Sequence, residues 1–289
     1  MQTIPTIPTM QTIPTIPTIP TMQTMQTIPR TIFQTWKSKT IIPENMAYWQ
    51  TTWRKHNPSY EFILWDDNDN RTFIETHYPW FLERYDSYQH MIQRADAVRY
   101  FYLYHYGGVY VDMDFECIKS FDDILQMENE NDVILGRMGD AEKYQHEHNI
   151  PNAIMISKPR ETFWICAFFC LLKANPADHR AEYTTGPVIL KETVEIYNEI
   201  IDRGLDITKL QWYDALVDIL LPDTKPEQLQ MSRIKVLDGD YFYPLNWRDW
   251  EQQVSMRHPV IEKNEIYNPE KVATLFPNSY AVTYWTHSY

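Results

Sequence analysis

The sequence has no long apolar run, and this shortage excludes a membrane-spanning helix. A bilayer-crossing helix needs roughly 20 apolar residues, and the longest candidate, around residues 163–172, is too short. The first residues also lack the basic start and the continuous apolar stretch of a secretory signal. We therefore expect a soluble protein without an integral membrane segment, in the cytoplasm or another soluble compartment.

Cysteine and positive charge are also scarce. The three cysteines are too few for a disulfide framework. Cys166 and Cys170 stand four residues apart in an apolar stretch, which predicts two core residues on one helix face. Only 26 Lys and Arg stand against 39 Asp and Glu, a net charge of −13 that argues against nucleic acid as a partner. Such an acidic protein needs a local device, such as a metal ion, if it handles phosphates.

The chain divides into a low-complexity tail, residues 1–28, and one globular domain, residues 29–289. The tail repeats Thr-Ile-Pro with Met-Gln interruptions. A proline every third residue removes backbone donors and favours polyproline II over helix or sheet. We expect a disordered tail, with a partner-binding arm as the alternative.

The globular part opens with alternating strands and helices. Strands are expected at 30–36, 60–65 and 109–115, with helices at 45–57 and 95–106 between them. This order predicts an α/β sheet that is covered on both faces and binds ligands at the carboxyl ends of its strands. Helix 95–106 is apolar or aromatic nearly all round, so it should be buried, and Gly107 should end it. Later in the chain we expect strands at 132–138 and 152–158, helices at 161–174 and 188–202, and strands or loops at 235–245 and 279–285.

Two acids close the third expected strand, in the stretch GGVYVDMDFE (107–116). Alternation would place Tyr110, Asp112 and Asp114 on one face of that strand. Alternate side chains stand about 6.5–7 Å apart, so the two acids should play unequal roles around one cation. A hard divalent ion that keeps waters and shares phosphates with a substrate fits this pattern. The alternative is a solvated strand end with two surface acids.

Three stretches together resemble a known family: IPRTIFQTW (28–36), RADAVRY (94–100) and GGVYVDMD (107–114). They look like glycosyltransferase family 32, the DXD-containing sugar transferases, which includes initiating mannosyltransferases and lactosylceramide galactosyltransferases. The glucosylating clostridial toxins are distantly similar. The resemblance is strong over about 28–125 and weaker beyond. It implies a GT-A fold with a Rossmann-like nucleotide-binding half and an acceptor half, a nucleotide-sugar donor, Mn²⁺ or Mg²⁺, and transfer with retention.

The resemblance also assigns roles to particular residues. Asp114 would bind the metal directly, and Asp112 would contact ribose and a metal-bound water. With Arg99 they form the expected catalytic set. The remaining donor-binding residues would be Trp36 stacking on the base, Asp96 and Arg99 on sugar hydroxyls and diphosphate, Tyr110 lining the pocket, and Asn152 and Gly186 bordering the transferred sugar. Taken alone, Asp96 and Arg99 also read as an intrahelical ion pair, and Trp36 as a core residue.

Two positions depart from the family pattern. Phe33 stands where the family commonly has His. Thr283 stands where the family has a C-terminal His near the metal, and His287, four residues on, is the candidate to replace it.

We expect a hexosyltransferase that moves a sugar from a UDP- or GDP-linked donor to a glycan, lipid or protein hydroxyl. One alternative is an inactive sugar- or nucleotide-binding protein on the same fold. A second is a phosphatase of the haloacid-dehalogenase type, which also uses an apolar strand followed by D-x-D. That motif has Thr or Val where this chain has Glu116.

Overall fold

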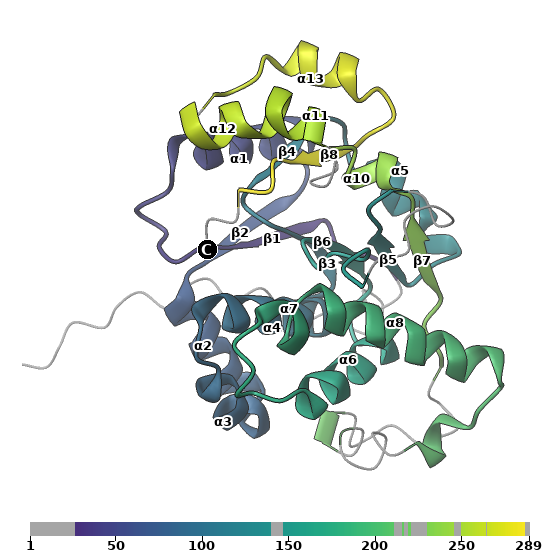
Figure 1. Cartoon of the computed structure of the whole chain (residues 1–289). Coiled ribbons are helices and arrows are strands. Elements are labelled where there is room, and N and C mark those ends of the chain that lie inside the picture. The colour runs from purple at the N-terminus through teal and green to yellow at the C-terminus, as the bar shows by residue number, and fades with distance from the viewer. Residues whose placement is uncertain are drawn as a thin grey trace, which may run out of the picture.

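The computed structural model describes residues 27–139, 147–210, 216, 219–220, 230–245, 250–263 and 265–286 (Figure 1). Its strands are β1 (Thr31–Thr35), β2 (Glu61–Trp65), β3 (Gly108–Val111), β4 (Phe115–Cys117), β5 (Val133–Gly136), β6 (Ile154–Ser157), β7 (Ile234–Leu237) and β8 (Ala281–Thr283). Six of them form one sheet in the order β2-β1-β3-β6-β5-β7, in which β6 runs antiparallel to both its neighbours and the other pairs are parallel. Strands β4 and β8 form a separate antiparallel pair. The expected α/β class is confirmed.

Helices cover both faces of the large sheet (Figure 1). One face packs on α2 (Asp67–His77), α3 (Pro79–Ser87), α4 (Met91–Tyr106), α6 (Thr162–Lys173) and α8 (Pro187–Asp202). The other face packs on α1 (Glu44–His56), α5 (Asp122–Leu125), α10 (Gly239–Phe242) and strand β4. Shorter elements are η2 (Gln126–Asn129), α7 (Ala181–Thr184), η3 (Ile207–Lys209), α11 (Trp250–Gln252), η5 (Gln253–Arg257), α12 (His258–Lys263) and α13 (Pro269–Leu275). Within the described ranges, no helix is both long and apolar enough to cross a bilayer.

Strand β1 lies at a point where the chain changes direction across the sheet. From β1 the chain passes through α1 to β2 on one side, and then through α2–α4 to β3 on the other. The two connections leave a crevice between the carboxyl ends of β1 and β3, the usual ligand position in such sheets. The fold therefore brings Trp36, just after β1, to the same edge as Asp112, just after β3.

Strand β3 is shorter than the sequence predicts. Its alternation holds as far as Val111: Tyr110 packs on the α4 side, and Val109 and Val111 pack on the other. Asp112 then donates its N–H to Ala153 O at 2.8 Å, and the chain turns out of the sheet. It resumes as β4, where Phe115 pairs with Thr283 of β8. The expected strand 109–115 is therefore wrong in extent: β3 ends at Val111, Phe115 already belongs to a strand that pairs with a distant segment, and both acids lie in the link between the two strands.

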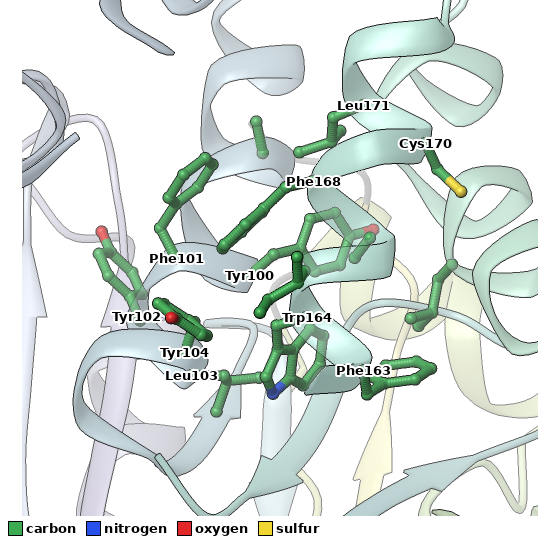
Figure 2. Close-up of a cluster of buried hydrophobic side chains, with 14 of the residues drawn as sticks. Tyr100, Phe101, Tyr102, Leu103, Tyr104, Phe163, Trp164, Phe168, Cys170 and Leu171 are labelled. Carbon is green, nitrogen blue, oxygen red and sulfur yellow. The ribbon is translucent and has the colours of Figure 1, made fainter. Parts of the chain in front are cut away.

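Helix α4 is buried as expected, with 13 of its 16 residues buried. Figure 2 shows its aromatic side chains against those of α6. The rings of Phe101 and Phe168 stack with centroids 4.1 Å apart, and those of Tyr100 and Trp164 stack at 5.9 Å. Gly107 ends the helix at φ 69°, as predicted, and its N–H bonds to Leu103 O. This packing fixes the position of the first turns of α4, which face the crevice.

The other expected elements are recovered with small shifts at their ends. Segment 235–245 contains both a strand, β7, and a short helix, α10. Cys166 and Cys170 are free and buried, as predicted. Ile28, at the predicted end of the tail, is buried in the core at 4% exposure. The preceding tail residues, 1–26, lie outside the described part of the chain.

Replacing Gly108 with Ala should destabilise the sheet by at least about 2 kcal/mol, since left-handed strain and overpacking add. Gly108 has φ 92°, and a Cβ there would lie 2.6 Å from Thr31 O, a backbone atom of the adjacent strand. Gly204→Ala is the matched control, because Gly204 has φ 56° but nothing within 4 Å of its Cβ, so strain alone should cost about 1 kcal/mol. Urea unfolding measures both costs, and equal losses would contradict the prediction.

Glu161, at the start of α6, should make stability depend on pH. Burial raises its pKa from 4.5 to about 7, and a hydrogen bond with Ser232 opposes this shift. Because the folded state binds the proton more tightly than the unfolded chain, this contribution is full below about 4.5 and lost as pH rises through about 7. Glu161→Gln mimics the protonated acid. In urea unfolding we expect it to exceed wild type in stability at pH 8 and to match it near pH 4.5. Identical pH profiles would contradict this.

Candidate functional site

A cavity of about 550 Å³ opens at the carboxyl ends of β1 and β3. Apolar side chains line much of it, among them Trp36, Met46 and Trp285. Its charged lining is unbalanced, with four carboxylates and one guanidinium among the described residues: Asp96, Asp112, Asp114, Glu182 and Arg99. The cavity is therefore a locally acidic site within an acidic protein.

Arg99 is the centre of a buried polar network in this cavity. Its side chain, 3% exposed, forms ion pairs with Asp96 Oδ1 at 2.9 Å and Asp112 Oδ1 at 3.2 Å. Two further donations go to Ala95 O at 3.1 Å and Asn152 O at 2.9 Å. The guanidinium also lies over the ring of Tyr110, 4.5 Å from its centroid. Arg99 thus fixes two carboxylates that come from different elements.

Both carboxyl groups that pair with Arg99 have pKa values that lie well above the usual value for Asp, closer to neutral pH. Burial raises the pKa of Asp96 to about 6 and that of Asp112 to about 6, against the effect of Arg99 in both cases. Asp112 is the more accessible of the two, with 30% of its side chain exposed against 8% for Asp96. A cation placed beside Asp112 would remove part of the cost of keeping it charged.

Asp114 is held by residues that follow strand β8. Its Oδ2 accepts from the N–H of Thr286 at 2.8 Å and from the Thr286 hydroxyl at 3.3 Å. Its backbone O accepts from the N–H of Tyr284 at 3.3 Å. Burial raises the pKa of Asp114, and the bonds from Thr286 and Thr283 oppose this shift. The second acid of the motif is therefore oriented by the C-terminal segment.

These residues fit a divalent cation whose shell the protein supplies only in part. The described residues contain no group of three or more His, Cys, Asp or Glu side chains suited to a metal. Two carboxylates that share one cavity suffice for an ion of the Mg²⁺ type, which completes its shell with water and substrate phosphates. The hydrogen bond from Tyr110 and the ion pair with Arg99 both use Oδ1 of Asp112. The hydrogen bond from the Thr286 N–H uses Oδ2 of Asp114.

Of three further expected donor-site residues, the structure places Asn152 in the cavity lining and Tyr110 and Gly186 next to lining residues. The amide of Asn152 donates to Asp96 Oδ1 at 3.2 Å. Tyr110 is fully buried and contacts Asp112, to which its hydroxyl donates at 2.7 Å. Gly186 packs against two lining residues: a Cβ added to it would lie 2.8 Å from Glu182 Cα and 3.2 Å from Asp96 Oδ2.

Trp36 lies at the cavity but shows little of its ring. It is 3% exposed, its indole N–H donates to Ile41 O at 3.0 Å, and the ammonium of Lys37 lies 5.0 Å from its ring centroid. The expectation that it stacks on a base stays a prediction.

The two departures from the family pattern have different surroundings. Phe33 points away from the cavity and stacks on Tyr102 and Tyr106 of α4, with centroids 5.4 and 5.5 Å away. Thr283 lines the cavity, and its hydroxyl accepts from the N–H of Trp285 at 3.1 Å. His287 lies outside the described residues.

Sequence reasoning missed Thr286 and Trp285. Thr286 stands 172 residues from Asp114, so no local pattern relates them. Trp285 has φ 51°, which is uncommon for a bulky residue and marks functional sites more often than ordinary loops. Neither feature has a signature in the sequence.

Residues 43–131, which contain Arg99, Asp96 and both acids of the D-x-D, match the family described as "Glycosyltransferase sugar-binding region containing DXD motif". Inositol phosphoceramide mannosyltransferase 3 of Schizosaccharomyces pombe is 50% identical over 98 residues, 34% of this chain and 27% of that protein. An uncharacterised glycosyltransferase of Acanthamoeba polyphaga mimivirus is 28% identical over 176 residues, 60% of this chain and 66% of that protein. The resemblance to DXD glycosyltransferases is confirmed.

The extent of these matches is limited. The chain spans about a quarter of the length of the first mannosyltransferases it matches. Among solved structures, the PaToxG glycosyltransferase is similar with a TM-score of 0.43 and 14% identity, over 71% of this chain and 87% of that one.

Proposed function

We propose that the domain at 29–289 is a metal-dependent glycosyltransferase of GT-A type that takes a sugar from a UDP- or GDP-linked donor and transfers it with retention. The matched segment 43–131 and the names of its relatives support mannose as the sugar. The acceptor in this proposal is a hydroxyl of a glycan, lipid or protein. The match speaks against the phosphatase alternative, because the D-x-D lies inside the segment that resembles a glycosyltransferase family.

The observation that carries this proposal is the charge of the cavity. A nucleoside diphosphate is an anion, and four carboxylates would repel it while the single guanidinium is already paired with two of them. A divalent cation at Asp112 and Asp114 would reverse the local potential and attract the diphosphate. The cavity therefore suits a donor that arrives with Mn²⁺ or Mg²⁺.

The residues have distinct tasks in this scheme. Asp114 and Asp112 would hold the ion. Arg99 orients Asp96 and Asp112, and its own donors are largely used within the protein. Asp96, with Asn152 beside it, is placed to accept hydrogen bonds from sugar hydroxyls.

Retention requires the acceptor to enter on the face from which the diphosphate leaves. The bond from the anomeric carbon to the phosphate oxygen breaks, and a bond from the same carbon to the acceptor oxygen forms through an oxocarbenium-like transition state. The acceptor proton passes to the leaving phosphate. A cation held by Asp112 and Asp114 would supply positive charge to stabilise the departing diphosphate. No protein nucleophile is needed in this scheme.

Donor hydrolysis tests the proposal. Purified protein is incubated with GDP-mannose and a panel of other GDP- and UDP-sugars, with Mn²⁺, with Mg²⁺ or with EDTA, and nucleoside diphosphate release is measured. We expect slow release from one donor that depends on the metal. Absence of both release and metal-dependent donor binding would refute it.

The alternatives give separate outcomes in the same experiment. Metal-dependent donor binding without release, even with candidate acceptors, indicates an inactive binding protein. Release of inorganic phosphate from p-nitrophenyl phosphate indicates a phosphatase.

A further inference from the structure

One peptide unit after strand β8 is held from both sides. The Trp285 carbonyl accepts two hydrogen bonds from Arg257, from Nε at 3.0 Å and from Nη2 at 2.8 Å. The Thr286 N–H, which belongs to the same planar peptide, donates to Asp114 Oδ2 at 2.8 Å. Arg257 therefore hydrogen-bonds to the oxygen of this amide, and Asp114 hydrogen-bonds to its N–H.

Two backbone irregularities meet at this contact. Trp285 takes the left-handed conformation at φ 51°, and Arg257 closes the π-helical turn η5. Both features carry a cost and recur at functional sites. The Tyr267 hydroxyl donates its one proton between Ser255 O and Met256 O of that turn, each at 3.1 Å. The turn is thus fixed independently of the cavity.

The side chain of Trp285 is fixed as well. Its indole N–H donates to Leu245 O at 2.7 Å, and its ring stacks on Tyr243 with centroids 5.6 Å apart. The side chain therefore has its own anchors, while the carbonyl is oriented by Arg257. A donor on a carbonyl polarises the amide and strengthens the N–H bond on its other side.

We propose that Arg257 is a positioning residue for the metal site: through the Trp285–Thr286 peptide it sets the orientation of Asp114. This inference rests on the proposed function, in which Asp114 binds the ion. Arg257 touches neither donor nor metal in this scheme. It takes part because the shorter of the two bonds from Thr286 to Asp114 Oδ2 comes from the backbone N–H of the peptide that Arg257 holds.

The direction in which cation affinity changes when Arg257 is removed distinguishes a positioning role from a simple charge effect. Arg257 is cationic and close enough to feel the charge of Asp114. If it acted only as a nearby positive charge, its removal would relieve repulsion and tighten cation binding. If it positions Asp114, its removal must weaken cation binding.

The test measures Mn²⁺ affinity by electron paramagnetic resonance of the free ion, on the full chain, for Arg257→Gln and Arg257→Lys. Supporting groups around metal ligands are worth about 10–100-fold in affinity, so we expect about a tenfold loss in Arg257→Gln. Lys keeps one donor and the charge but not the fork, so its affinity should fall between Gln and wild type. Arg203→Gln, an exposed arginine paired with Glu199 on α8, is the matched control and should bind as wild type.

Each other result overturns the inference. Tighter binding in Arg257→Gln, with Lys unchanged, indicates a charge effect. A lower Tm with unchanged affinity indicates a role in folding alone, and the milder Lys variant keeps this readout available if Gln unfolds the protein. Wild type that binds no Mn²⁺ refutes the proposed metal site and this inference with it. Wild-type binding with unaffected variants refutes this inference alone.

Discussion

Asp114→Asn should abolish metal-dependent donor hydrolysis while raising the stability of the metal-free protein. The amide oxygen of Asn can still accept the Thr286 N–H, so the local fold should persist. Loss of the charge removes a metal ligand, and metal stabilisation of a leaving group is worth several kcal/mol, or on the order of 10³-fold in rate. Burial raises the pKa of Asp114, which means that its charge opposes folding, so neutralising it should raise Tm.

The measurements are nucleoside diphosphate release at saturating Mn²⁺ and thermal unfolding in EDTA. Asp123→Asn is the matched control, because Asp123 is exposed on α5 and lies outside the cavity. It should change neither quantity. Activity of Asp114→Asn within tenfold of wild type would remove Asp114 from the metal site. A lower Tm would show that its charge has a partner in the folded state.

Arg99→Met should cost about 3–5 kcal/mol of unfolding free energy, because it leaves buried carboxylates without their cation. Asp96 and Asp112 both pair with this guanidinium, and the side chain is 3% exposed. The cost is measured by urea unfolding at pH 8, where both acids are ionised in the unfolded chain. Adding Asp96→Asn to the variant should recover part of the loss, since one of the two uncompensated charges is then gone.

Arg71→Met provides the comparison for a surface arginine. Arg71 is 42% exposed and pairs with Asp86 at 2.8 Å and Glu75 at 3.4 Å. Exposed pairs contribute about 0–1 kcal/mol, so this variant should lose little. If Arg99→Met lost no more than Arg71→Met, the network would not hold the two carboxylates as we describe.

The local patterns of the sequence were reliable where burial alone decides them. The all-round apolar character of 95–106 predicted a buried helix, and Gly107 marked its end. The apolar strands after residue 30 predicted a covered α/β sheet with ligands at its carboxyl edge, and the cavity lies there. Side-chain periodicity reports burial directly, because each residue of a helix or strand points to one face.

The alternation of side chains gave a wrong strand assignment at Asp112 and Asp114. It placed Asp112 and Asp114 on one strand face at a fixed spacing, whereas the structure puts both in the link between β3 and β4, which belong to different sheets. The strand ends at Val111 because β4 finds its partner in β8, near the other end of the chain. Pairing between distant segments has no local signature, so alternation could not locate the break.

The sequence by itself determined the α/β class, the buried helix that presents Asp96 and Arg99, and the D-x-D at the edge of the sheet. Only the tertiary structure decided what surrounds those acids. It joined Arg99 to two carboxylates and brought Thr286 onto Asp114, with Arg257 behind the same peptide. The physical reason is that burial is encoded residue by residue, whereas the orientation of a charged group depends on donors that the folded chain delivers from far away.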